Sequence, residues 1–504
     1  MQPEVEDEVR IGKELYSYQI RAVDQIFSYF QKNTRDKYNL LFQLPTGGGK
    51  TVIFSEITRR FIEETDTKVL ILTHRIELCG QTERMLTEFG VNTMVINSSV
   101  KKLPKDNNYR CFIAMVETLN NRLTDEDIKM ENLGLIIVDE AHNNSFNKLF
   151  KFFEKGITLG VTATPLSSNI NLPMHRNYHE LIVGESISSL IEKGFLAKPD
   201  VHRYDVGLSG LKIGINGDYT VKSSELLYAN LPMQEKLIKA YEEQAKGKKV
   251  LIFNNGIRTS KQVYINFQDS GYDIRHLDNK TPAKERKEIL EWFKVTPGAI
   301  LTSVSILTTG FDEPTVESVI LNRATRSLTL YFQMIGRGSR ILPTKNSFKI
   351  IDLGNNVARF GPWEGDIDWQ RIFRSPDFYL QNIMSDEEIE RRFVYKMPED
   401  LKLRFANSTD IDFDVYTEYD KVMSEKLRPP VTLERSLAQH VRMCVENSED
   451  VYDARELARL LEDDIAQRVE KYSYCITKST LNYRRWLRED YMTKLRKELN
   501  KHFD

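Results

Sequence analysis

The chain has no long uninterrupted apolar run, and its amino-terminus lacks the composition of a targeting peptide. A membrane-spanning helix needs about 20 predominantly apolar residues in a row, and no stretch of the 504 residues supplies them. The first residues include Glu4, Glu6, Asp7 and Glu8, where a targeting peptide would place basic and then apolar side chains. The sequence therefore predicts a cytoplasmic protein without a targeting signal or a membrane span.

Cysteine and net charge are also scarce. The four cysteines are scattered, without the spacing of a disulfide framework or a zinc site, which is typical of a reduced intracellular protein. The formal net charge is −2, so the composition gives no general attraction to nucleic acid, and any such binding has to come from local patches. The length of 504 residues predicts about two to four domains.

A glycine-rich segment, Leu-Pro-Thr-Gly-Gly-Gly-Lys-Thr, occupies residues 44–51. An apolar stretch precedes it and a helix-compatible stretch follows, which is the context of a phosphate-binding loop. The glycines let backbone N–H groups approach a phosphate, and the next helix adds its positive dipole end. Lys50 is placed to reach the phosphates and Thr51 to ligate Mg²⁺. Leu44 stands where the general pattern has glycine, and the alternative interpretation is a glycine-rich turn.

Apolar strands alternate with helical patterns in two successive sets, which predicts an α/β fold with two tandem parallel-sheet domains. The expected strands are residues 38–44, 68–73, 110–115, 133–139 and 157–162, then 249–254, 272–277, 299–303, 318–322 and 348–353. The predicted organisation is a lead-in at 1–14, a first domain at 15–200, a connector at 201–230, a second domain at 231–356 and a mainly helical region at 357–504. In the last region we expect helices at 433–445, 454–471 and 480–499, after a linker at 428–430.

An acidic pair ends the fourth expected strand. Asp139 and Glu140 follow Leu-Ile-Ile-Val, and the carboxyl end of a parallel strand faces the same crevice as the phosphate-binding loop. Asp139 is placed to hold Mg²⁺ through water, and Glu140 to orient and deprotonate an attacking water. Acidic residues at a strand end can also cap a helix. The catalytic interpretation of this pair therefore depends on the phosphate-binding loop in the same expected sheet.

Three further segments carry polar residues beside expected strands. Thr162-Ala163-Thr164 is either a polar turn or a hydroxyl switch between two sites. Residues 307–312 form a loop with Gly310 and Asp312. Residues 333–340 end a helix with Arg337 and Arg340 three positions apart. An exposed arginine pair is usually solvated, yet arginines from a second domain can neutralise a γ-phosphate bound by the first, an effect worth roughly 10³–10⁵ in rate.

Taken together and in this order, these segments resemble the motifs of superfamily 2 helicases and translocases. Tyr18-Gln19 is similar to the adenine-reading glutamine region, and residues 45–51 to motif I, which tolerates a residue other than glycine at position 44. The remaining similarities cover motifs Ia to VI at residues 73–75, 117–119, 139–142 (a DEAH box), 162–164, 251–254, 302 with 310–312, and 333–340. The resemblance implies two RecA-like domains that use ATP and Mg²⁺ to act on nucleic acid.

Roles follow from the resemblance residue by residue. It implies that Glu140 is the general base, that Arg337 and Arg340 are arginine fingers, and that His142 and Gln333 link the γ-phosphate to the second domain. The implied catalytic set is Glu140, Arg337, Arg340, Gln333 and Lys50. The implied cofactor-binding set is Gln19, Pro45, Thr46, Gly47, Gly48, Gly49, Lys50, Thr51, Asp139, His142, Gly310 and Asp312. The implied Mg²⁺ ligands are Thr51 and Asp139. The implied nucleic-acid contacts are Arg75, Thr118 and Thr302.

Within the superfamily, the short Leu-Tyr-Ser-Tyr-Gln opening, Gly194-Phe195-Leu196 and the segment at 351–356 resemble the XPB, RecG, UvsW and restriction-motor branch. That branch mostly acts on duplex or branched DNA, so DNA is the favoured partner, together with protein partners in repair or defence. Two alternatives stay open: an RNA helicase, and an ATP-binding scaffold subunit of a repair or defence complex. No nuclease signature is apparent after residue 356.

The last expected helix combines basic and aromatic residues. Its basic members are Lys478, Arg484, Arg485, Arg488, Lys494, Arg496, Lys497 and Lys501, and they alternate with Tyr483, Trp486 and Tyr491. The pattern fits a patch that grips duplex DNA. It equally fits a solvated helix face above an apolar core, because charge runs are usually solvated.

Overall fold

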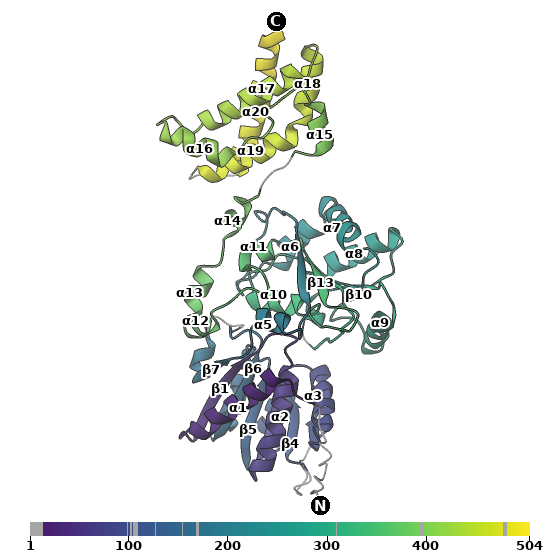
Figure 1. The fold of residues 1–504 in the computed structure, drawn as a ribbon, viewed down its shortest axis with the longest axis vertical. Helices are drawn as coiled ribbons and strands as arrows, with labels where there is room; N and C mark the ends of the chain where they lie inside the picture. The colour runs from purple at the N-terminus through teal and green to yellow at the C-terminus, as the bar shows by residue number, and fades with distance from the viewer. Residues whose placement is uncertain are drawn as a thin grey trace, which may run out of the picture. The chain divides into compact units, whose positions relative to one another are not determined.

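The computed structural model describes residues 14–503, apart from residues 98, 101–102, 104–108, 126–127, 154, 168–170, 309, 394–396 and 477–480. The chain divides into two compact units, Met1–Met384 and Ser385–Asp504 (Figure 1). The first unit contains two parallel sheets and the second is helical. This confirms the predicted α/β fold with two parallel-sheet domains and a mainly helical carboxy-terminal region.

Among the described residues, the first sheet has seven strands in the order β3-β4-β2-β5-β6-β1-β7, and every neighbouring pair is parallel. The strands are β1 (Lys37–Gln43), β2 (Lys68–Thr73), β3 (Thr93–Ile96), β4 (Cys111–Met115), β5 (Leu133–Asp139), β6 (Gly156–Thr162) and β7 (Glu180–Val183). The five predicted strands are present. The sequence did not indicate β3 and β7, because each has four residues and both lie at sheet edges, where the apolar pattern is weak.

Helices cover both faces of the first sheet because its strands are apolar on both sides. The elements are α1 (Ser17–Lys32), α2 (Lys50–Glu64), α3 (Ile76–Glu88), α4 (Val116–Thr124), η1 (Asn144–Phe152), η2 (Met174–Arg176) and α5 (Ile187–Glu192). One face packs its buried side chains with α1, α2 and α3, and the other with α4 and η1. The fixed strand ends between these layers position the loops that follow β1 and β5.

The second sheet has the order β10-β11-β9-β12-β13-β8 among the described residues, again with parallel neighbours throughout. Its strands are β8 (Lys198–Arg203), β9 (Val250–Asn254), β10 (Ile274–Leu277), β11 (Ile300–Ser303), β12 (Ser318–Asn322) and β13 (Ser347–Asp352). Its helices are α6 (Val221–Tyr228), α7 (Leu231–Gln244), α8 (Ile257–Asp269), α9 (Ala283–Val295), η3 (Ser305–Leu307) and α10 (Leu328–Ile335). Strand β8 spans the boundary expected at residue 200, so the segment treated as a connector begins inside the second sheet.

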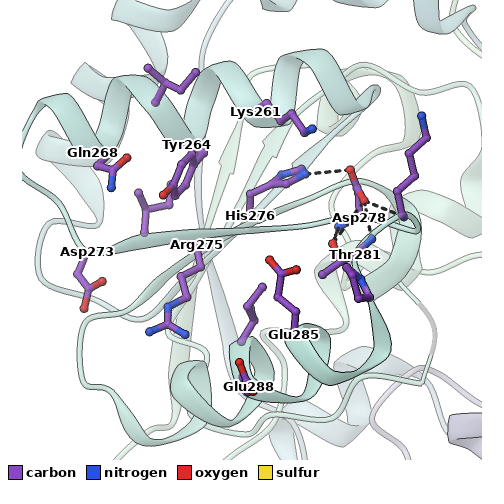
Figure 2. Close-up of a pocket in the computed structure, with 15 residues that line it drawn as sticks. Lys261, Tyr264, Gln268, Asp273, Arg275, His276, Asp278, Thr281, Glu285 and Glu288 are labelled. Atoms are coloured by element: carbon purple, nitrogen blue, oxygen red, sulfur yellow. Dashed lines mark hydrogen bonds and ion pairs between the residues drawn. The ribbon is translucent and has the colours of Figure 1, made fainter.

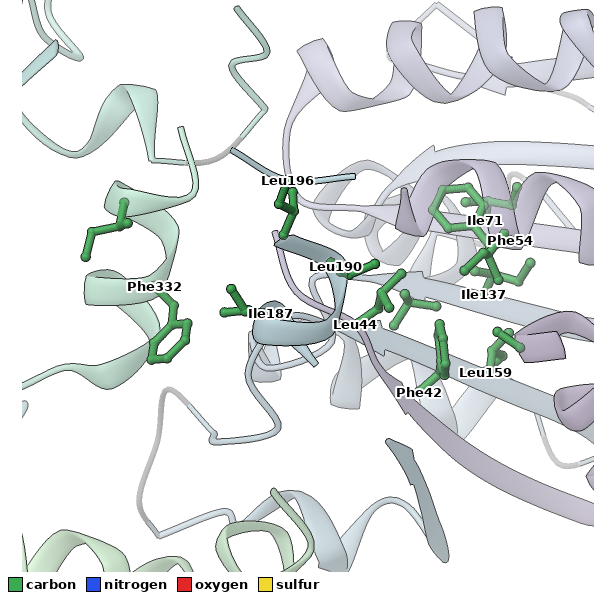
Figure 3. Packing of buried hydrophobic residues seen from close by; sticks show 14 of the residues in the cluster. Phe42, Leu44, Phe54, Ile71, Ile137, Leu159, Ile187, Leu190, Leu196 and Phe332 are labelled. Carbon is green, nitrogen blue, oxygen red and sulfur yellow. The ribbon is translucent and has the colours of Figure 1, made fainter. Parts of the chain in front are cut away.

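One apolar cluster runs through both sheets and explains why they form a single compact unit. Phe42 and Leu44 of the first sheet share this cluster with Leu190 of α5 and with Phe332 of α10 (Figure 3). All four side chains are buried. Burial of such side chains stabilises by roughly 1.5–3 kcal/mol each, so the region between the two sheets is part of the core.

Residues 357–384 belong with the two sheets and not with the helical unit. They contain α12 (Trp369–Arg374) and α13 (Pro376–Gln381), after α11 (Asn356–Phe360). Trp363 packs against Phe348 of β13 with ring centroids 5.9 Å apart, and the Gln370 amide donates to the Leu181 carbonyl of β7 at 2.8 Å. The segment therefore extends from the second sheet back to the first. The boundary between the two compact units lies after Met384, whereas the sequence predicted the start of the helical region after residue 356.

The second unit packs its helices around a separate core. The helices are α14 (Asp386–Glu390), α15 (Glu399–Arg404), α16 (Val415–Ser424), α17 (Val431–Glu446), α18 (Val451–Leu460), α19 (Glu462–Cys475) and α20 (Leu481–Phe503). The single helix expected at 454–471 is two helices that meet at Leu461. Three acidic residues in the first turn of α19 favour a new helix start there, since they complement the helix dipole. The expected linker at 428–430 leads into α17 inside this unit, where Pro430 is the N-cap. No helix in the described part of the chain is long and apolar enough to span a membrane.

A buried polar network crosses the core of the helical unit. The His440 imidazole bonds Asp464 at 2.7 Å through Nε2 and Tyr491 at 2.9 Å through Nδ1. Arg468 forms an ion pair with Asp464 at 2.6 Å. Burial lowers the pKa of His440 to about 4, so His440 is neutral near pH 7. It donates from Nε2 to Asp464 and accepts the tyrosine proton at Nδ1.

The network predicts a large difference between two adjacent aspartates. Asp464→Ala leaves Arg468 buried without its carboxylate, which costs about 3–5 kcal/mol of stability. Asp463 is exposed, so Asp463→Ala should change stability by less than about 0.5 kcal/mol. Amide hydrogen exchange of α17 and α19 measures the effect locally. Equal exchange in the two variants would show that the ion pair contributes little.

Candidate functional site

The glycine-rich segment at residues 44–51 joins β1 to α2 and has the backbone of a phosphate-binding loop. Gly47 and Gly49 have φ values of 90° and 84°, a left-handed region that favours glycine. The Lys50 ammonium donates to the Leu44 and Pro45 carbonyls at 3.4 and 3.5 Å. Lys50 therefore lies along the inner side of its own loop, and α2 directs its positive end to the same place.

Leu44 has a packing function that accounts for the departure from glycine. Its side chain is fully buried in the apolar cluster. A Cβ at Gly48 would lie 2.9 Å from the Leu44 Cγ atom. The Leu44 side chain thus packs between the loop and the core. Position 48 has to be glycine because a Cβ there would clash with this side chain.

The acidic pair lies at the end of β5, beside this loop. The Glu140 N–H donates to Asp139 Oδ1 at 3.0 Å. Glu140 has a φ of 51°, which is strained for a residue with a side chain. Its Oε2 atom is buried and accepts no hydrogen bond from the described residues, although His142 Nδ1 lies 3.3 Å away. A strained residue with an unpartnered carboxylate oxygen is the arrangement expected of a group that acts on a ligand.

Opposite charges surround this pair in a poorly solvated site. Burial and the neighbouring Glu140 raise the pKa of Asp139, while Lys50 opposes the rise. Burial also acts to raise the pKa of Glu140, but Lys50, His142, Arg337 and His74 together hold it below its usual value. The Lys50 pKa is lowered by burial against the attraction of both carboxylates. Glu140 is therefore ionised near pH 7, as a general base has to be.

A chain of hydrogen bonds runs from the first sheet to α10. The Gln333 amide donates to His142 Nε2 at 3.4 Å, and His142 Nδ1 lies 3.0 Å from the Thr162 hydroxyl. The Thr162 hydroxyl donates to the Thr164 carbonyl at 3.0 Å. This order requires a neutral His142, and burial lowers the His142 pKa. Thr164 also donates to Thr329 of α10 at 2.9 Å, so Thr162 and Thr164 both take part in contacts between the sheets.

The two predicted arginines extend from the end of α10 toward the loops of the site. Arg340 donates to the Gly47 carbonyl at 2.8 Å and to Asp312 at 2.9 Å. Arg337 donates to the carbonyls of Thr308 and Phe311, while its Nε atom is buried without a partner among the described residues. Burial lowers the pKa of Arg337 to about 10, against the attraction of Glu140. Both side chains thus lie at the phosphate-binding loop, and Arg337 keeps its charge near pH 7.

The predicted adenine region borders the same loop. The Gln19 carbonyl oxygen accepts from the Tyr16 N–H at 2.9 Å, and the Tyr18 hydroxyl donates to the Gly48 carbonyl at 2.8 Å. Phe195 packs against both tyrosines, with ring centroids 4.4 and 5.0 Å away. The sequence had indicated Gln19 but not this aromatic group. In the sequence, this group could have been recognised only from the aromatic residues of Leu-Tyr-Ser-Tyr-Gln and Gly-Phe-Leu.

The nucleic-acid contacts predicted from the sequence have different outcomes. Thr302 is fully buried in β11, and its hydroxyl bonds Asn254 at 2.9 Å and Ser260 at 3.0 Å. Its hydroxyl is therefore occupied within the sheet in this structure, and its contact with nucleic acid stays a prediction. Arg75 donates to the Ile306 carbonyl of η3 at 2.7 Å, which joins the two sheets. Thr118 is half-buried on α4, and no contact of its side chain tests the prediction.

A cavity of about 820 Å³ opens between the two sheets beside Arg75. The first sheet contributes His74, Arg75 and Met115 to its lining, and the second contributes Asn255 and Arg286. Arg286 also pairs with Glu77 at 3.2 Å across the cavity. The lining also contains Glu77 and Glu225, so arginines from both domains and two carboxylates share this space.

A second large cavity, of about 840 Å³, lies along the sheet edge formed by β10 (Figure 2). Lys261 and Tyr264 of α8 face Glu285 and Glu288 of α9 across it. His276 bonds Asp278 at 3.0 Å within the lining. Its charges are mixed and it contains none of the predicted site residues, so it is separate from the site.

The residues present fit ATP and Mg²⁺. The partnerless Glu140 Oε2 and Arg337 Nε atoms lie where a ligand would complete their hydrogen bonds. Mg²⁺ takes few protein ligands and completes its shell with phosphates and water. Thr51 and Asp139 are the residues that would hold it.

Comparison with known proteins agrees with this site. Residues 12–167 match the family described as "Type III restriction enzyme, res subunit", and residues 232–342 match "Helicase conserved C-terminal domain". The chain therefore carries both of these family domains, which is consistent with the restriction-motor-like branch of superfamily 2 helicases. These domains imply an ATP-hydrolysing enzyme.

Individual relatives are distant. A 51.5 kDa protein of a Lactococcus phage is 28% identical over 337 residues, which cover 66% of this chain and 69% of the relative. The putative ATP-dependent helicase IRC3 of Saccharomyces cerevisiae is 28% identical over 370 residues, or 68% of this chain and 53% of the relative. A solved structure of the Type ISP restriction-modification enzyme LlaBIII bound to DNA has a TM-score of 0.53 at 16% identity and covers 97% of this chain, but this chain covers only 40% of it. This chain therefore spans about half of the length of IRC3 and less than half of the length of LlaBIII.

The loop geometry predicts a sharp effect at Gly49. A Cβ at this position would lie 2.5 Å from the Gln19 amide nitrogen, and its φ of 84° disfavours any side chain by about 1–2 kcal/mol. Gly49→Ala should weaken binding of a fluorescent ATP analogue at least about tenfold.

Gly80→Ala is the matched control, because nothing lies within 4 Å of a Cβ there and the position is inside helix α3. This variant should bind the analogue like the unmodified protein. Similar affinities for the two variants would contradict the assignment of the loop.

Proposed function

We propose that the protein is an ATP-dependent translocase or helicase that acts on duplex or branched DNA. The observation that carries the proposal is the buried carboxylate oxygen of Glu140, which accepts no hydrogen bond from the described residues and lies 3.3 Å from His142 Nδ1. It stands next to the phosphate-binding loop and within the field of Lys50 and Arg337. A structural carboxylate in such a place would have its bonds satisfied. A general base for water attack needs an oxygen that is available to substrate.

In the proposed ATP hydrolysis, the two sheets contribute different residues. In the first, the backbone of residues 45–49 and Lys50 hold the phosphates, and Gln19 with Tyr18 and Phe195 borders the base. Bound Mg²⁺ would neutralise phosphate charge and orient the leaving group. In the second, Arg337 and Arg340 stabilise the charge that develops on the transferred phosphoryl group. Gly310 and Asp312 support these arginines through the loop after β11, where Asp312 orients Arg340.

The same contacts link hydrolysis to movement. Gln333 bonds His142, and Arg340 bonds Gly47, so a nucleotide at the loop stabilises the two sheets against one another. Loss of the γ-phosphate removes part of that stabilisation. The cavity of Arg75 and Arg286 is lined by both sheets, so a nucleic-acid backbone in it would be gripped differently as the sheets separate.

Several relatives favour DNA. The names of two relatives include "Type I restriction enzyme EcoAI endonuclease subunit" and "ATP-dependent DNA helicase RecG", and the LlaBIII structure contains DNA. An RNA helicase is the alternative, since the RNA helicase DBP5 of Saccharomyces cerevisiae is 20% identical over 370 residues. A scaffold subunit that binds ATP without hydrolysis is less consistent with the strained Glu140 backbone.

ATPase rates with matched duplex, forked, four-way and single-stranded DNA and with RNA separate these hypotheses. Greatest stimulation by duplex or branched DNA supports the proposal. Greatest stimulation by RNA supports the alternative, and the absence of any ATPase with all of them supports a scaffold.

Removal of the proposed base gives the most direct prediction. Glu140→Gln keeps the size of the side chain but cannot accept a proton, so steady-state ATP hydrolysis should fall at least about 10²-fold while ATP binding persists. Unchanged turnover in this variant would refute the role of Glu140.

The second sheet gives an independent prediction. Arg337→Ala should reduce nucleic-acid-stimulated hydrolysis by about 10³-fold and leave affinity for the ATP analogue within a few-fold. Arg203→Ala is the control, because Arg203 is an exposed arginine at the end of β8 in the same domain. Normal stimulated hydrolysis in Arg337→Ala would remove the arginine from the mechanism.

A further inference from the structure

An exposed aromatic pair lies on α20 in the helical unit, outside both matched family segments. Tyr483 and Trp486 are stacked, with ring centroids 5.7 Å apart and an angle of 20° between the planes. Tyr483 is 36% exposed and Trp486 is 53% exposed. Single exposed aromatic residues are common on protein surfaces, whereas a contiguous apolar patch points to a binding surface, and this pair is contiguous.

The pair borders a groove with a rigid base. Tyr483 and Trp486 line it together with Leu433 and Leu437 of α17 and Tyr472 of α19. Beneath the pair, Leu487, Tyr491 and Leu495 of α20 are buried in the core of the unit. The Tyr491 hydroxyl is held by His440 and Ser436, both at 2.9 Å. The aromatic surface is therefore fixed in place by the buried network.

Basic side chains continue along the same helix. Helix α20 carries seven lysines and arginines and three acidic residues, a difference of +4 (7 − 3). Lys494, Lys497 and Lys501 follow Trp486 by 8, 11 and 15 residues. At 100° per residue these three lie within about 80° of Trp486 on the helix, about 12–22 Å along its axis.

The other basic residues of α20 have different surroundings. Arg484 is occupied, because it lies over the Tyr474 ring and 3.8 Å from Glu470. Arg485, Arg488, Arg496 and Lys497 form no ion pair with any described residue and are exposed. Asp490 and Glu434 also line the groove. Lys494 pairs with Asp490 at 2.7 Å and Lys501 with Glu498 at 2.6 Å, both within one turn of α20 and with the lysine exposed, so a phosphate would compete with these pairs. Lys478 lies outside the described residues.

We propose that this surface, the Tyr483–Trp486 platform, binds single-stranded nucleic acid by stacking an unpaired base on Trp486 while the lysines downstream on α20 contact phosphates. Every base has a flat face that stacks on an aromatic ring, and a basic surface beside the ring follows the backbone. A peptide would gain little from the lysine row. This inference rests on the proposed nucleic-acid function and adds a second contact outside the two sheets.

The test uses the full chain and the oligonucleotide (dT)20, without ATP. Binding should quench tryptophan fluorescence, because a base stacks on Trp486. Trp486→Ala should weaken binding about tenfold and abolish the quenching, within the range for loss of one stacked base. Trp486→Phe keeps a ring, so its affinity should stay within about threefold while the quenching is lost. Tyr452→Ala is the matched control, since Tyr452 is 72% exposed on α18 of the same unit.

Unchanged affinity and quenching in Trp486→Ala would overturn the platform. No quenching in the unmodified protein would do the same and would favour a protein segment as the occupant of the groove. The ATPase assay keeps this result separate from the proposed function. At saturating duplex DNA, the ATPase turnover of Trp486→Ala should equal that of the unmodified protein. If the proposed function is wrong, duplex DNA will stimulate ATP hydrolysis in neither protein.

Discussion

The contact between the phosphate-binding loop and the end of α10 is the constraint on which the rest of the first unit depends. A Cβ at Gly336 would lie 2.6 Å from the Thr46 side chain, and Arg340 reaches the Gly47 carbonyl. Only a close approach of the two sheets brings the loop, the acidic pair and the arginines to one place. Neither sheet alone contains all the residues of the candidate site. The completeness of the site therefore depends on the relative position of the two sheets.

Maintaining this contact requires several charges in a poorly solvated place. Lys50, Asp139, Glu140 and Arg337 each lose solvation there, and mutual attraction outweighs that loss only at Glu140. The apolar cluster around Leu44, Leu190 and Phe332 supplies stability beside them. The strain at Glu140 and the partnerless atoms on both sides of the site persist because this surrounding core is rigid.

The helical unit uses a polar core for a different purpose. Its network around His440 and Asp464 is fully hydrogen-bonded at the imidazole, and a satisfied buried network specifies a single packing arrangement. Tyr491 connects that network to α20. The position of α20, which carries the exposed Tyr483 and Trp486 rings, thus depends on residues of α17 and α19 that are distant in sequence.

The sequence by itself determined the strands with long apolar runs, the phosphate-binding loop and the residues that follow each strand. These features depend on local patterns, since buried parallel strands are apolar throughout and the carboxyl ends of such strands meet at one edge. Gln19, Lys50, Glu140, Gln333 and Arg340 were therefore named as candidates from the sequence, and the structure brings them to one place. The short edge strands β3, β7 and β8 and the break at Leu461 were not identified, because pairing and packing determine them.

Only the tertiary structure decided which polar residues are available to a ligand. Thr302 and Arg75 looked alike as candidates, yet one is fully buried in β11 and the other joins the two sheets. Exposure depends on how strands pair and how the sheets pack, which no local pattern encodes. The same holds for Leu44: the sequence marked it as a departure from glycine, and the fold gave the reason, because the residue that fills this space beneath the loop belongs to the core.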